Sequence, residues 1–127
     1  MKAIVDTHTF LWWDSDPSKL SGTALAFIQD PTNFIYLSVA SVWEIVIKQQ
    51  LGKLSATLPL HVRITQQRSN GLLILPATLE HVLAVETLPT LHKDPFDRLL
   101  VAQAKVEHAC VVTGDPVFPQ YGVNVIW

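Results

Sequence analysis

The sequence predicts a three-layer α/β/α sandwich around a central, mostly parallel sheet of about five strands. Continuous apolar runs, rather than alternating ones, are typical of strands that are buried on both faces. Segments with helical spacing separate most of these runs, as expected for a parallel sheet covered by helices. The length of 127 residues favours one domain, residues 1–127, with one core. The expected strands are 3–5, 34–37, 72–75, 110–113 and 123–126.

The segments between the strands show helical periodicity and recognisable ends. Ser21 and Thr78 are expected N-caps, and Pro95 is expected at the first position of its helix. Pro31 and Gly52 mark ends. The expected helices are 8–13, 22–29, about 38–51, 59–68, 79–86 and 95–108.

Composition excludes several classes of protein. Hydrophobic residues make up 49% and charged residues 16%, which argues against disorder. No apolar stretch approaches the roughly 18 residues of a membrane span, and Asp6 interrupts the N-terminus too early for a secretory signal. The single cysteine, Cys110, permits no internal disulfide and favours a cytoplasmic location. The net charge of −2 argues weakly against nonspecific nucleic-acid binding, but bound divalent cations would reverse its sign.

Four acidic residues are predicted to meet at one edge of the sheet. Asp6 and Asp115 follow strands, while Glu44 and Asp97 lie near the starts of helices. Ligands of open α/β sheets bind beyond the carboxyl ends of the strands, which is this edge. Clustered carboxylates repel one another unless a cation compensates. A site of oxygen ligands without His or Cys indicates Mg²⁺ or Mn²⁺.

Each acid also has a structural interpretation when it is taken alone. Asp94 fits an N-cap before Pro95, and Asp97 would then favour the helix dipole. Glu44 fits either a capping box with Ser41 or an ion pair with Lys48. Asp6 is a possible N-cap and Asp115 lies in a turn composition, so only the common edge favours a shared site.

Other kinds of chemistry find little support. The five histidines have no zinc-ligand spacing, and the chain lacks a glycine-rich phosphate loop and a Gly-x-Ser-x-Gly elbow. His8 and His92 are the histidines expected nearest the acidic edge. The adjacent Trp12 and Trp13 exceed one core face, which favours a subunit or partner interface. Phosphate contacts are possible at Lys48, Lys53, Arg63, Arg68, Lys93, Arg98 and Lys105.

Four segments, in order and spacing, resemble the PIN-domain proteins, and most of all the VapC-type toxins of bacterial toxin–antitoxin pairs. They are Val5-Asp6-Thr7-His8, Ser41-Val42-Trp43-Glu44-Ile45, the block from His92 to Ala104, and Val112-Thr113-Gly114-Asp115. The block that contains Asp94-Pro95-Phe96-Asp97-Arg98-Leu99-Leu100 is the most specific, and the similarity covers essentially the whole chain.

The resemblance implies a Mg²⁺- or Mn²⁺-dependent endoribonuclease that a cognate antitoxin protein keeps silent, usually as a homodimer. Asp6, Glu44 and Asp97 match the core acids of the family, and Asp115 matches the fourth, more variable one. Asp94 matches an additional acid of this branch and is the least secure ligand. Two departures are His8, where the family often has a small hydroxyl residue, and the proline that follows Asp115.

The expected reaction is hydrolysis of an RNA phosphodiester by water, with one or two metal ions bound by these acids. An aspartate-dependent phosphatase or phosphotransfer domain with Asp6 as nucleophile is an alternative, although no second acid stands close behind it. A catalytically inactive PIN-like binding module, whose acids only cap helices, is another.

Overall fold

The computed structural model describes residues 1–127 and contains a single sheet of five strands. Every neighbouring pair is parallel, and the strand order is β3-β2-β1-β4-β5, which confirms the predicted sheet. The strands are β1 Lys2–Val5, β2 Phe34–Ser38, β3 Leu73–Leu75, β4 Cys110–Val112 and β5 Val125–Ile126.

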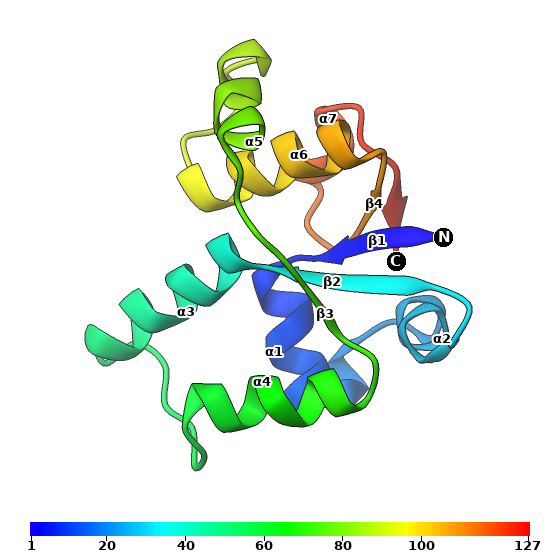
Figure 1. Ribbon diagram of the computed structural model, residues 1–127, viewed down its shortest axis with the longest axis vertical. Coiled ribbons are helices and arrows are strands. Elements are labelled where there is room, and N and C mark those ends of the chain that lie inside the picture. Colours follow the sequence, from blue (N-terminus) through cyan, green and yellow to red (C-terminus); the bar gives the residue numbers. More distant parts are fainter.

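Helices cover both faces of the sheet. Figure 1 shows α5, α6 and α7 on one side and α1, α2 and α4 on the other. The helices are α1 Thr7–Ser15, α2 Gly22–Gln29, α3 Val39–Gln50, α4 Leu60–Ser69, α5 Leu79–Ala84, α6 Pro95–Glu107 and α7 Val117–Gln120, with 3₁₀ turns η1 Pro17–Lys19 and η2 Val85–Thr87. None of the helices has the length and apolar character needed to cross a membrane.

The core consists of two apolar layers, one on each face of the sheet. Successive side chains of β1 belong to opposite layers of the core. Ile4 packs with Leu100 and Phe118 in one layer. Val5 packs with Phe10 in the other layer. All five of these side chains are completely buried. The continuous apolar runs of the sequence are therefore explained by a sheet with no solvent-exposed face.

The predicted helix starts are largely correct. The Ser21 hydroxyl accepts a 3.0 Å hydrogen bond from the backbone N–H of Ala24, and Thr78 caps α5. Ser38, rather than Ser41, is the N-cap of α3. The helix start expected near residue 38 is therefore confirmed, the capping box considered for Ser41 and Glu44 is absent, and Glu44 lies in the second turn of α3.

Two features of the C-terminal half were not expected from the sequence. Residues 117–120 form the short helix α7, and the final strand is confined to Val125–Ile126.

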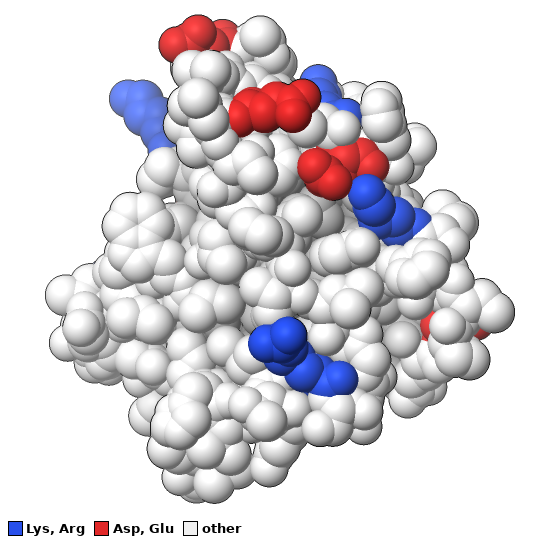
Figure 2. Space-filling view, viewed as in Figure 1, with Lys and Arg blue, Asp and Glu red and all other residues white.

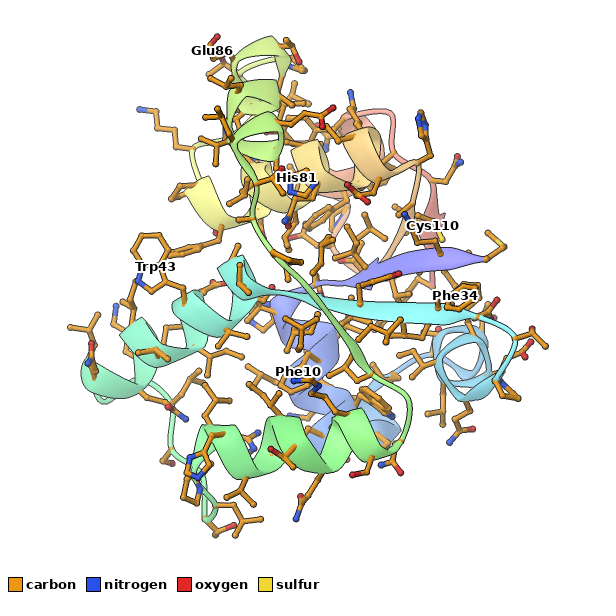
Figure 3. The ribbon with its side chains drawn as sticks, viewed as in Figure 1. Phe10, Phe34, Trp43, His81, Glu86 and Cys110 are labelled. Atoms are coloured by element: carbon orange, nitrogen blue, oxygen red, sulfur yellow. The ribbon has the colours of Figure 1, made fainter.

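The apolar side chains of α5 point to solvent, with exposed fractions of 75% for Leu79 and 51% for Val82 and Leu83. The side chain that α5 buries is instead His81, which points toward α6 in Figure 3.

Candidate active site

The carboxyl ends of β1 and β4 form the topological switch point of the sheet. β1 lies between β2 and β4, so the chain leaves these neighbouring strands toward opposite sides. Asp6 follows β1 directly, and Asp115 lies three residues after β4. α3, which carries Glu44, starts where β2 ends. The sheet therefore brings three of the predicted acids to one edge.

Asp6 is held in place from both sides. Its Oδ1 accepts a 2.8 Å hydrogen bond from the backbone N–H of Thr9, so that Asp6 is the N-cap of α1. Its Oδ2 accepts a 2.6 Å bond from the Thr113 hydroxyl. The same hydroxyl accepts a 3.0 Å bond from the backbone N–H of Asp115. Thr113 therefore fixes the spacing between the segments that follow β1 and β4.

Glu44 is buried on α3 and faces the start of α1. Its Oε1 accepts a 2.6 Å hydrogen bond from the Thr7 hydroxyl. Its Oε2 forms a 2.9 Å ion pair with Nζ of Lys48, one helical turn later. The predicted pairing with Lys48 is thus present, but it coexists with burial beside Thr7 rather than placing Glu44 on an open surface.

Asp97 lies in the first turn of α6, with Asp94 as the N-cap. Oδ1 of Asp94 accepts hydrogen bonds from the backbone N–H groups of Phe96, at 2.9 Å, and Asp97, at 3.2 Å. The Asp97 carboxylate itself accepts no hydrogen bond, and Nε2 of His92 lies 3.6 Å from its Oδ2. Asp94 is therefore a cap, as expected, and Asp97 is the acid without a hydrogen-bonding partner.

The electrostatic environment of Asp97 includes the other predicted acids. Burial is the largest cause that raises the pKa of the Asp97 carboxyl from 3.8 to about 7. The negative charges of Asp94, Glu44, Asp6 and Asp115 add to this rise, in that order. The structure therefore brings the other four predicted acids close enough to Asp97 to raise its pKa, an effect that a bound cation would oppose.

The donors fit a hydrated hard cation better than a closed cage of protein ligands. No three acidic, His or Cys side chains are arranged to hold an ion directly among themselves. Mg²⁺ usually keeps several waters and takes only one or two carboxylates, which this arrangement of separate acids would allow.

Two of the predicted basic residues make structural contacts, whereas two histidines lie near the acids. Arg63 is buried in a 2.6 Å ion pair with Asp14, and Arg98 donates to the carbonyl oxygen of Pro89. Both arginines therefore serve the fold. Among the expected histidines, His92 approaches Asp97, and His8 lines a pocket that also contains Asp6 and Asp115.

Sequence reasoning missed the hydroxyl residues that position the acids. Thr7 and Thr113 hold Glu44 and Asp6, yet each bond joins residues far apart in the chain. The one available signal was position, because each threonine stands within two residues of a predicted acid, at the end of a buried strand.

The comparisons with known proteins agree with this geometry. The family model described as "PIN domain" matches residues 3–124. No curated protein sequence matches the chain. Among solved structures, the chain is similar to one in the crystal structure of VapBC2 from Rickettsia felis bound to a DNA fragment from their promoter. That match has a TM-score of 0.73 and 15% identity, and it covers 98% of this chain and 97% of that chain. Because the family model spans nearly the whole sequence, the chain belongs to the PIN-domain family.

Proposed function

We propose that the protein is a Mg²⁺- or Mn²⁺-dependent endoribonuclease and the toxin of a toxin–antitoxin pair. The observation that carries the proposal is Asp97, a carboxylate without a hydrogen-bonding partner that four other carboxylates surround. Such an arrangement costs stability in the free protein, and it is expected where a cation is to be bound. Membership of the PIN-domain family and similarity to VapBC2 from Rickettsia felis support the toxin assignment.

The five acids would have different roles at the metal. Asp6 and Asp97 would hold the metal, with Glu44 and Asp115 acting directly or through water, and Asp94 mainly capping α6. When bound, the metal supplies Lewis-acid polarisation of the phosphate and a water of lowered pKa. Thr113 and Thr7 orient the Asp6 and Glu44 carboxylates, and Lys48 offsets part of the charge of Glu44.

The two alternative functions fit the contacts less well. Asp6 is a poor candidate for a phosphorylated nucleophile, because Thr9 and Thr113 occupy both of its oxygens. An inactive module whose acids only cap helices would account for Asp6 and Asp94, which accept from helix N–H groups. It gives no reason for burying Glu44 beside Asp97, so catalysis is the better account.

We also propose a homodimer, a protein antitoxin and a cytoplasmic location. Leu79, Val82 and Leu83 of α5 form an exposed apolar face that a second copy would cover. Figure 2 shows that charged residues on the viewed face lie mainly over α5 and α6, with a basic side chain near β3 and α4, whereas the area over α3 is free of them. Trp43, which is 62% exposed, projects from α3 in Figure 3.

The proposed cytoplasmic location rests on Cys110, which is free and buried and therefore suits a reducing compartment.

Cleavage of total RNA by the purified chain tests the proposal. Cleavage in Mg²⁺ should disappear with EDTA and in the folded variant Asp97→Asn, and expression of the wild-type chain should arrest growth. Glu86→Gln, which removes an exposed carboxylate on η2 outside the acidic site, serves as the matched control. Equal cleavage by wild type and Asp97→Asn would contradict the proposal.

A further inference from the structure

An aromatic pocket lies beside the acids. Asp6 and Asp115 share a pocket of about 280 Å³ with His8, Trp12 and Trp127. His8 and Trp12 are one turn apart on α1, with ring centroids 5.9 Å apart. The ring of Trp12 lies 6.2 Å from that of Trp127. Three aromatic rings therefore follow one another along the wall of a pocket that starts at the acidic site.

The wall also includes Thr9 and Gly114. A Cβ on Gly114 would stand 2.7 Å from Cε2 of Trp127. The glycine therefore lets the indole lie directly against the loop that carries Asp115.

The pocket continues into a second one. His8, Trp12 and Lys19 also line a pocket of about 500 Å³ that extends to Arg63 and to residues 54–58. The only basic residue common to both is Lys19, which is exposed and takes part in no ion pair. In contrast, the charge of Arg63 is already matched by Asp14. Together the two pockets, which share His8, Trp12 and Lys19 in their linings, are termed the channel, and Lys19 is the free positive charge common to both.

We propose that this channel seats single-stranded RNA next to the scissile phosphate. A base stacks on His8 and Trp12, and Lys19 contacts the phosphate that follows. This inference rests on the proposed ribonuclease function and adds a specificity-determining subsite to it. Stacking on aromatic rings combined with a cation along the backbone is the usual way in which proteins bind single strands.

The lining favours RNA over a peptide from a protein partner. Asp6 and Asp115 beside the rings would help to hold a divalent cation, which would offset their charge and allow a polyanion to approach. The free cation at Lys19 then contacts the next phosphate. An apolar peptide would leave Lys19 without an anionic partner.

Binding of a labelled single-stranded oligoribonucleotide, followed by fluorescence anisotropy in Ca²⁺ at several salt concentrations, tests the subsite. His8→Ala should weaken binding roughly fivefold or more, and His8→Phe should restore it because the ring is retained. Lys19→Ala should reduce the slope of log affinity against log salt by about 0.7, and Lys19→Arg should restore that slope. Both residues are exposed, so these variants should fold.

A control is available at the opposite edge of the sheet. Phe34, which is 58% exposed at the start of β2 (Figure 3), should leave RNA binding unchanged when replaced by Ala. Unchanged RNA binding by His8→Ala and Lys19→Ala would overturn the subsite, even where wild type still cleaves RNA. Loss of antitoxin binding alone in these variants would assign the channel to the protein partner instead. Failure of the wild type to cleave RNA would count against the ribonuclease function, whereas anisotropy tests the subsite separately.

Discussion

The Thr113 hydroxyl donates a 2.6 Å hydrogen bond to Oδ2 of Asp6 and so joins residues 107 positions apart. The bond is buried, and the same oxygen accepts from the backbone N–H of Asp115. One side chain therefore orients the acid that directly follows β1 and the loop after β4. The acidic site depends on such contacts as much as on the acids themselves.

Thr113→Val should weaken the metal site without removing any acid. The substitution leaves Oδ2 of Asp6 and the N–H of Asp115 without their partner, at a cost of about 1–3 kcal/mol in the free energy of unfolding. Mn²⁺ affinity should fall about 10- to 100-fold, as is usual when a residue that orients a ligand is lost. Urea unfolding and calorimetric Mn²⁺ titration measure both effects. Thr113→Ser keeps the hydroxyl and should resemble wild type; equal losses in both variants would rule out the hydrogen bond as the cause.

The stability of the metal-free protein should depend on pH through Asp97. Its pKa is raised from 3.8 to about 7 in the folded state, so folding favours the protonated carboxyl. This contribution is fully present below about pH 4 and is lost as pH rises through about 7. In urea unfolding with EDTA, the free energy of unfolding of wild type should fall over this pH range. Asp97→Asn should lack this contribution to the fall. Parallel pH profiles for the two proteins would contradict the prediction.

Asp97→Asn should also stabilise the metal-free protein near neutral pH, because it removes one of the crowded negative charges. The same change should abolish metal-dependent cleavage. A gain in melting temperature with a loss of activity is the pattern expected of a binding site that costs stability. A substitution that lowered the melting temperature in EDTA would instead assign Asp97 a structural role.

The buried polar network behind the site should contribute to stability rather than to chemistry. Gln103 of α6 accepts a 2.6 Å bond from Ser38 and donates to the carbonyl oxygen of Pro76. Gln103→Leu should cost about 1–3 kcal/mol, since the Ser38 hydroxyl and the Pro76 carbonyl lose their partner. The exposed Gln120, replaced by Leu, is the matched control, and its unfolding free energy should change by less than about 0.5 kcal/mol. Equal urea midpoints for both variants would refute the expectation.

Charge placed on the α5 face should disrupt self-association without unfolding the chain. Leu79 and Leu83 are exposed, so Leu79→Glu and Leu83→Glu together remove no buried contact in the monomer. Light scattering should show wild type as a dimer and the double variant as a monomer with an unchanged circular dichroism spectrum. A monomeric wild type, or a dimeric variant, would contradict the role of this face.

The sheet and its acids were accessible from the sequence because they depend on local patterns. Continuous apolar runs separated by helical spacing imply a parallel sheet, and the ends of parallel strands must share an edge. Asp6 and Asp115 follow from that rule alone, and the cap at Asp94 follows from Pro95. These features are set by residues within a few positions of one another.

The remaining features depend on tertiary contacts that no local pattern records. The hydrogen bond from Thr7 to Glu44 joins separate helices. Whether Lys19 has an acidic partner likewise depends on the tertiary structure, in which it forms no ion pair. α5 illustrates the same limit. Its apolar side chains resemble a core face, but His81 is buried instead, because Nε2 of His81 bonds Glu107 at 2.8 Å.

Calorimetric titration of Mn²⁺ into the metal-free protein tests the central claim, that these acids form one cation site, most directly. Wild type should show saturable binding with release of protons near pH 7, because binding ionises Asp97. Asp97→Asn should retain its fold and lose this binding. Indistinguishable titrations for wild type and Asp97→Asn, or no saturable binding by wild type, would contradict the account.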